Sequence, residues 1–197
     1  MADMPDLGPA ARRMADLVSG VADERLADPT PCPEYTVGDL IDHVNGLSLA
    51  FTWAAEKSFA DSPGGGPSGD ASRLEPGWRS LIPERLAALA EAWRDPSAWQ
   101  GMTQAGGVDL PGEIAGFVAL NELVIHGWDL ARGTGRPYEA TPEEIEVCLR
   151  VSTPQPGEER TPDNGLFGPP VPVAGDAPPL DRLIGFTGRD PGWTPSR

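Results

Sequence analysis

The chain has 197 residues, and its 30 acidic and 15 basic side chains give a formal net charge of −15 at pH 7. A surface this acidic repels nucleic-acid phosphates and anionic lipid headgroups, so we expect neither a nucleic-acid nor a membrane partner. A chain of this length can bury one hydrophobic core, with appendages to it.

Four segments carry apolar residues at helical spacing and predict a bundle of four helices. They cover residues 9–27, 36–57, 79–94 and 111–132. Thr36 is expected to cap the second helix, with Asp39 three residues later completing a variant of the capping box. Pro83 suits the first turn of the third helix, where a missing N–H costs little. The fourth is apolar nearly all round, which predicts a central position.

The connections between these helices are rich in glycine and proline. Residues 62–69 are expected to form a flexible surface loop, because their glycines and prolines favour neither helix nor strand. Residues 95–107 are expected to be a linking segment, with a short extended piece at residues 102–108.

The end of the chain has a different character. Thr141, Pro142 and Glu144 are favourable at the start of a fifth helix over residues 141–151. Eight prolines then fall between residues 153 and 179, too many for another bundle helix, and a short helix is expected at 179–186. Leu166, Phe167, Val171 and Val173 give this arm apolar groups to bury. The predicted fold is all-α: a four-helix bundle at residues 1–152 and a proline-rich C-terminal arm at residues 153–197.

The two histidines stand where metal ligands would be useful. His126 lies four residues after Glu122 within the fourth predicted helix, so their side chains share one face. His43 lies in the second predicted helix and can complete a set of two histidines and one carboxylate. Catalytic zinc sites use this set and keep the fourth position open. We therefore predict a divalent metal site, zinc in type, at His43, Glu122 and His126.

Two alternatives to an open metal site remain. Glu122 and His126 can form a buried hydrogen-bonded pair without any metal. Cys32, just before the second helix, can approach as a fourth ligand and close the site, although a small buried residue is the simpler interpretation. Acidic residues within one turn of each histidine can orient its imidazole through the second ring nitrogen, or remain solvated surface charges. They are Asp39 and Asp42 for His43, and Asp129 for His126.

Other polar and aromatic residues are weaker candidates. Trp128 and Trp193 can line a pocket, but packing is the simpler interpretation. Cys148 has no partner motif and is expected in the core. Three arginines could meet an anionic substrate, although surface ion pairing is more common. They are Arg132, Arg182 and Arg189.

Two segments of the chain resemble the metal-binding domain of the mycothiol-dependent maleylpyruvate isomerase family. They are residues 30–43, Thr-Pro-Cys-Pro-Glu-Tyr-Thr-Val-Gly-Asp-Leu-Ile-Asp-His, and residues 121–135, Asn-Glu-Leu-Val-Ile-His-Gly-Trp-Asp-Leu-Ala-Arg-Gly-Thr-Gly. Residues 167–173 and 181–193 resemble a shorter subgroup of that family, known mainly for expected metal binding. The resemblance implies a DinB-like four-helix bundle and a zinc-type ion held by residues matching His43, Glu122 and His126. Tyr35 stands where the family usually has tryptophan.

The resemblance also implies a thiol, mycothiol, as the cofactor. The isomerase has a further C-terminal domain for which this chain is too short, so the isomerase reaction itself does not transfer. The hypothesis is a thiol-dependent enzyme, an S-transferase or an isomerase, acting on an electrophilic or small organic substrate. The first alternative is a non-catalytic metal- or ligand-binding bundle. A metal-dependent hydrolase is the second, weakened because no general base is evident near Glu122.

The expected cellular location is the cytoplasm. The first residues lack the basic and apolar segments of a signal peptide, and no apolar run reaches about 18 residues. Cys32 and Cys148 lack CxxC spacing, so both thiols are expected to be reduced. The sequence does not indicate the oligomeric state.

Overall fold

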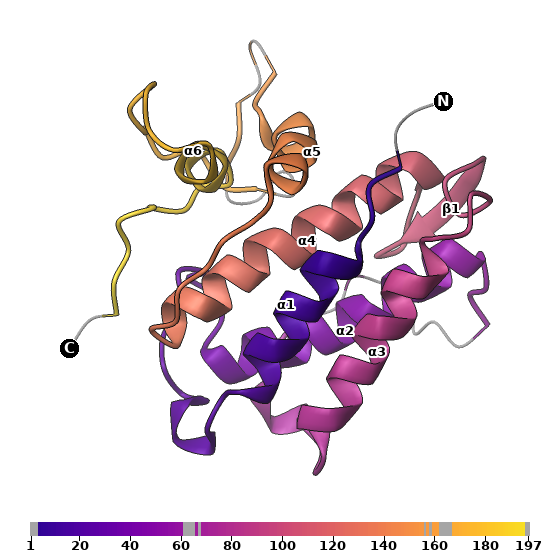
Figure 1. The fold of residues 1–197 in the computed structure, drawn as a ribbon, viewed down its shortest axis with the longest axis horizontal. Helices are drawn as coiled ribbons and strands as arrows, with labels where there is room; N and C mark the ends of the chain where they lie inside the picture. Colours follow the sequence, from indigo (N-terminus) through magenta and orange to yellow (C-terminus); the bar gives the residue numbers. More distant parts are fainter. Residues whose placement is uncertain are drawn as a thin grey trace.

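The computed structural model describes residues 4–60, 66, 68–155, 157, 159–161 and 167–195. This part of the chain is mostly helical (Figure 1). Its α-helices are α1 Gly8–Ser19, α2 Val37–Glu56, α3 Trp78–Ala92, α4 Gly112–Gly133, α5 Pro142–Ser152 and α6 Pro179–Phe186. Two 3-10 turns lie at Asp23–Arg25 and Ala71–Arg73, and two strands, β1 Met102–Ala105 and β2 Val108–Pro111, precede α4.

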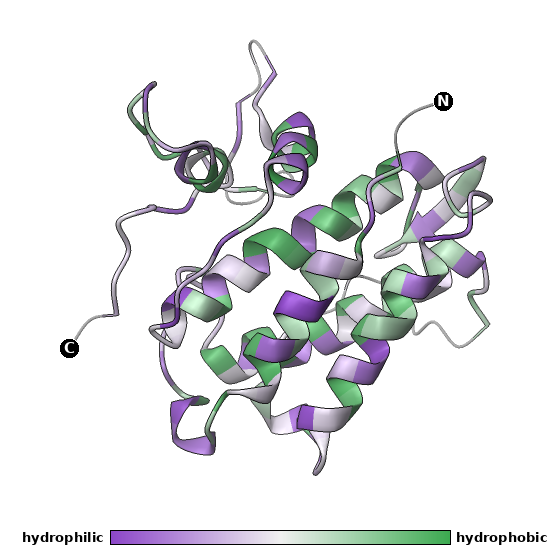
Figure 2. Ribbon diagram, in the orientation of Figure 1, coloured by the Kyte–Doolittle hydropathy of each residue, from purple (hydrophilic) through white to green (hydrophobic). Residues whose placement is uncertain are grey.

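The first four helices pack against one another around a single core. Helices α1 and α2 each contact both α3 and α4, while α5 contacts α4 and α6 contacts α5. Figure 2 shows hydrophobic and hydrophilic residues alternating along the helices, as expected when one face of each is buried. The arrangement brings α2 and α4 into contact along the faces that carry the two histidines.

Helix α2 starts where its sequence predicts. The hydroxyl of Thr36 accepts a hydrogen bond from the backbone N–H of Asp39, and the Asp39 carboxylate accepts one from the backbone N–H of Thr36. This reciprocal pair satisfies two donors that the first turn would otherwise leave free. The helix ends at Lys57, whose backbone is left-handed with φ 54°. These caps set where α2 begins and ends, and His43 lies in its second turn.

Helix α1 is shorter than predicted. It ends at Ser19 rather than near residue 27, and a 3-10 turn follows at Asp23–Arg25. Gly20 caps the helix: its N–H donates to the carbonyl of Leu17, and the N–H of Val21 donates to the carbonyl of Val18. Glycine has a low helix propensity, so the chain can turn here. Val21 is still buried, which explains why its spacing imitated a longer helix.

The described residues are mostly helical, as expected, with one small β-hairpin in addition. Strands β1 and β2 pair antiparallel in the register Met102↔Pro111 through Ala105↔Val108. Gly106 and Gly107 join them with φ of 59° and 81°. Two consecutive positive φ angles define the tight hairpin turn that glycine favours most. The predicted linking segment therefore contains β1, and β2 follows it directly, where one extended piece at residues 102–108 was expected.

Helix α4 lies at the centre of the molecule. Among the described residues it is the one helix long and apolar enough to cross a membrane, but 78% of its apolar window is buried inside the protein. Burial to this extent is typical of a helix in a protein core. Its glycines permit close packing: a Cβ added at Gly116 would lie only 2.5 Å from the ring of Trp99.

The C-terminal segment returns to α4 after α6. The backbone N–H of Val171 donates to the carbonyl of Gly185, and the side chain of Val173 lies against the same glycine. Phe167, Val171 and Val173 are half-buried, whereas Leu166 lies outside the described residues. Beyond α6, Arg132 of α4 donates to the carbonyl of Pro191 at 2.5 Å, which holds the end of the chain against α4.

Candidate metal centre

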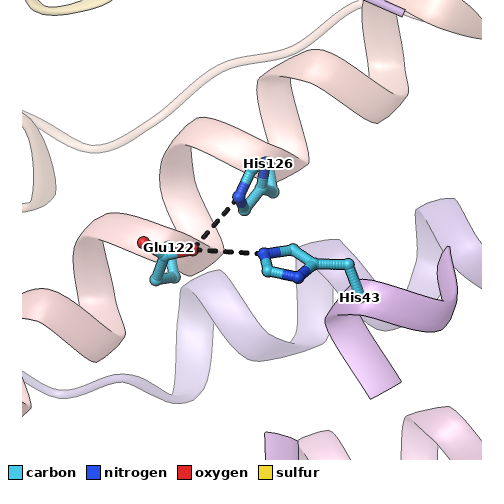
Figure 3. Close-up of side chains that lie close together, drawn as sticks. All are labelled: His43, Glu122 and His126. Carbon is cyan, nitrogen blue, oxygen red and sulfur yellow. Dashed lines mark ion pairs between the residues drawn. The ribbon is translucent and has the colours of Figure 1, made fainter. Parts of the chain in front are cut away.

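Helices α2 and α4 bring three potential metal ligands together. Figure 3 shows His43 pointing from α2 toward Glu122 and His126, which lie one turn apart on α4. The Nε2 atom of His126 lies 3.1 Å from Oε2 of Glu122, and the Nε2 atom of His43 lies 3.7 Å from the same oxygen. The two imidazole rings meet edge to face, with centroids 4.9 Å apart. One donor atom from each residue lies within 4.8 Å of the other two.

This geometry fits a small divalent cation. Two zinc bonds of about 2.1 Å at a tetrahedral angle place their ligand atoms about 3.4 Å apart. The two distances to Oε2 of Glu122, 3.1 Å and 3.7 Å, bracket that value. Two imidazoles and a carboxylate form a ligand set that suits zinc. Side-chain exposures of 12% for His43, 18% for Glu122 and 10% for His126 show that the group is recessed but not sealed.

Behind His126 lies a buried chain of charged groups. The Nδ1 atom of His126 is 3.0 Å from Oδ2 of Asp129, whose side chain is fully buried. Arg189, from the segment after α6, contacts both oxygens of that carboxylate: its Nε lies 2.8 Å from Oδ1, and its Nη2 lies 2.8 Å from Oδ2. A carboxylate behind a ligating histidine orients the ring and increases its basicity.

The protonation of these groups follows from their contacts. Although burial opposes its ionisation, hydrogen bonds from His126 and His43 hold the pKa of Glu122 well below its usual range. Burial likewise opposes charge on His126, but hydrogen bonds with Asp129 and Glu122 raise its pKa to about 9. Without metal, a protonated His126 therefore lies between two carboxylates, and a metal ion at Nε2 would replace one proton.

The metal-free protein is expected to lose stability between pH 6.5 and about 9. A group whose pKa is raised by folding stabilises fully below its unfolded pKa, and the contribution is lost as pH rises through its folded pKa. A shift of His126 from 6.5 to about 9 corresponds to about 3 kcal/mol. Urea unfolding of chelator-treated protein across this window measures the loss.

The control for that experiment is His126→Gln, which cannot titrate and should show a much flatter profile. Identical profiles for the two proteins would contradict the assignment. Burial raises the pKa of Cys32 from 9.0 to about 11. Its contribution to the free energy of unfolding is therefore lost only above pH 9, outside the range in which His126 acts.

Two acidic residues expected near His43 have other partners. Asp39 serves the cap of α2 and accepts from the backbone N–H of Ala71 at 2.8 Å. Asp42 accepts two hydrogen bonds from Arg73, at 2.9 and 2.6 Å. Of the three candidate acids, Asp129 directly contacts an imidazole, at 3.0 Å from Nδ1 of His126.

The cysteines and tryptophans take the simpler of the roles considered for them. Cys32 is a half-buried free thiol outside the three-residue cluster, and Cys148 is fully buried in the core. Trp128 is buried at 4% exposure, and Trp193 packs half-buried against the core. The possibility that Cys32 closes the site as a fourth ligand has no support in these contacts.

Two features of the site escaped the sequence reasoning. Arg189 was considered only as a substrate contact or a surface ion pair, whereas its side chain lies 12% exposed against a buried aspartate. The ring of Tyr35 lies 5.0 Å from that of His43. No local spacing in the sequence signals either contact.

Comparisons with known proteins identify the family and support the fold. Residues 7–131 match the model of the "Mycothiol maleylpyruvate isomerase N-terminal domain". Two uncharacterized proteins of Mycobacterium tuberculosis, one from each of two strains, are 31% identical over 182 residues, covering 89% of this chain and 91% of theirs. The crystal structure of a mycothiol-dependent maleylpyruvate isomerase aligns with a TM-score of 0.55 and 20% identity, covering 75% of this chain and 66% of that chain. At that identity the structural match supports the fold.

Proposed function

Because the chain belongs to the mycothiol maleylpyruvate isomerase N-terminal domain family, we propose that it holds a divalent metal ion at His43, Glu122 and His126 and uses it in thiol-dependent chemistry. The observation that carries the proposal is the convergence of these three donor atoms within 4.8 Å. Residues 1–152 are proposed to be the family's DinB-like metal-binding bundle, with α1–α4 as its four helices and α5 packed on α4, and residues 153–197 as an arm on it.

The residues of the chain have distinct parts in this scheme. Glu122 supplies the negative charge that offsets a dication, and its position one turn before His126 keeps both on one face of α4. Asp129 accepts a hydrogen bond from Nδ1–H of His126, so Nε2 would turn its lone pair toward the cluster when a metal replaces its proton. A zinc ion in such a site supplies a Lewis acid that lowers the pKa of a thiol reaching it.

The substrate class follows from the thiol. A thiol with a lowered pKa is a nucleophile at neutral pH, which suits transfer of its sulfur to an electrophile or isomerisation through its transient addition. Mycothiol is the thiol that the family name indicates. The side-chain exposures of 10–18% support access by a small molecule, as catalysis requires. A metal that served stability alone would need no such access.

Cobalt-loaded protein tests the thiol step. Co²⁺ replaces zinc in such sites and gives visible absorption that changes when sulfur joins the ligands. Mycothiol is expected to add an intense near-ultraviolet sulfur-to-cobalt band, while methanol at the same concentration leaves the spectrum unchanged. If cobalt binds in the protein but mycothiol leaves its spectrum unchanged, the non-catalytic metal-binding alternative replaces the proposal. The Glu122→Ala variant, treated identically, controls for cobalt bound elsewhere.

A further inference from the structure

Arg189 is tied to the metal cluster through an unbroken series of short contacts. Its Nε atom donates to Oδ1 of Asp129 and its Nη2 atom donates to Oδ2, and a third hydrogen bond joins Nε to Oδ2 at 3.0 Å. Oδ2 of Asp129 then meets Nδ1 of His126 at 3.0 Å, and Nε2 of His126 meets Glu122 at 3.1 Å. Arg189 is 60 residues from Asp129 in sequence, so this contact joins the C-terminal arm to α4.

The end of α6 directs Arg189 toward Asp129. Gly188 has φ 82°, a left-handed conformation that glycine adopts readily, and its backbone lies close to that of Gly168 and Pro169. The backbone N–H of Arg189 donates to the carbonyl of Ile184, and its Nη1 donates to the carbonyl of Thr187 at 3.2 Å. The guanidinium is therefore oriented by its own turn as well as by the carboxylate.

Asp129 requires this partner. Its side chain is fully buried, and a carboxylate in that position is costly unless it is paired and hydrogen-bonded. His126 contacts one of its oxygens. Arg189 contacts both, which fixes the plane of the carboxylate, because a guanidinium binds a carboxylate as a rigid fork. Asp129 can then hold the His126 ring in one orientation and one tautomer.

We propose that Arg189 is a positioning residue of the metal centre, acting through Asp129 on His126. The inference rests on the proposed function, because it assigns the arm a part in the same site. The arm thereby supports, through Asp129, a ligand that α4 carries. Loss of a group that supports a metal ligand from behind typically lowers metal affinity by about 10–100-fold.

A double-mutant cycle on zinc affinity tests the proposal. Zinc dissociation constants are measured by competition with a chromophoric chelator for the full-length protein, Arg189→Gln, Asp129→Asn and the double variant. We expect each single variant to bind zinc about 10–100-fold more weakly. Because Arg189 acts through Asp129, the double variant should be no weaker than the weaker single variant. Wild-type affinity in Arg189→Gln, or fully additive losses, would overturn the proposal.

Failure of the proposed function looks different in the same experiment. If the unaltered protein binds no stoichiometric zinc, the metal centre itself is refuted; if it binds zinc and Arg189→Gln binds equally well, only the role of Arg189 fails. Circular dichroism checks that each variant is folded. Should Arg189→Gln not fold, Arg189→Lys is measured instead: its single ammonium cannot grip both oxygens, so affinity should still fall.

Arg132→Gln separates positioning from simple anchoring of the arm. Arg132 holds the same segment through the carbonyl of Pro191 without contacting Asp129. This variant should keep zinc affinity close to that of the unaltered protein. Nitrogen-15 NMR of His126 in the zinc-loaded proteins supplies a second measurement: the Nδ1–H signal should shift in Arg189→Gln and not in Arg132→Gln. If both variants changed the zinc affinity and the Nδ1–H signal equally, Arg189 would only attach the arm to α4, and the proposal would be wrong.

Discussion

Stoichiometric zinc is expected to disappear from the protein when Glu122 is replaced by alanine. Glu122 is the one anionic member of the cluster, and both histidines point toward its Oε2 atom, at 3.1 and 3.7 Å (Figure 3). Removing it leaves two neutral imidazoles, which neither offset the charge of a dication nor hold three of its positions. Metal analysis after dialysis against trace zinc measures the effect.

His43→Ala and His126→Ala should lose zinc in the same way, because each removes one of three donors. Cys32→Ser is the matched control: its thiol lies outside the cluster, so this variant should keep one zinc per chain. Full zinc content in all three ligand variants would refute the site. Loss of zinc in Cys32→Ser would instead support a closed centre in which Cys32 is the fourth ligand.

The second large effect concerns stability. Zinc at a free concentration 1,000 times its dissociation constant should raise the free energy of unfolding by about 4 kcal/mol, because it binds the folded chain alone. In the folded chain, α2 and α4 hold the ligand atoms within 4.8 Å of one another. In the unfolded chain nothing holds His43 near Glu122, because the two residues are far apart in the sequence. Thermal melts with zinc and with chelator measure the difference.

Glu122→Ala provides the comparison for those melts. Its melting temperature should respond little to zinc or to chelator, because zinc stabilises the folded chain only by binding to this site. A zinc-dependent increase of equal size in Glu122→Ala would show that the ion acts elsewhere, for example among the many surface carboxylates of this acidic chain.

Local interactions explain which parts of the fold the sequence predicted well. The reciprocal cap of Thr36 and Asp39 lies within four residues, and α2 begins where this pair places it. The i,i+4 spacing of Glu122 and His126 likewise follows from helical geometry alone, and the structure places them 3.1 Å apart. Such features need no knowledge of tertiary packing.

The errors lie where packing or turn chemistry prevails over hydrophobic spacing. Val21 kept helical spacing although the helix had already ended at Ser19, because a buried residue after a turn imitates another helical turn. Gly106 and Gly107 did carry a signal for the hairpin, since a two-residue glycine loop between short extended segments favours one.

The arrangement around His126 could not be foreseen from spacing. Asp129 was a candidate because it lies three residues away on the same helix, and the structure confirms its contact. Arg189 approaches from 60 residues further along the chain, and nothing in the local sequence selects it among the arginines of the arm. Its role depends on the path of the chain after α6, which only tertiary structure gives.

Anomalous diffraction from crystals of the zinc-loaded protein, recorded on both sides of the zinc absorption edge, tests the metal centre most directly. We expect one strong peak about 2.0–2.2 Å from Nε2 of His43, Nε2 of His126 and a carboxylate oxygen of Glu122. A zinc peak elsewhere on the molecule, with none between α2 and α4, would contradict the metal centre.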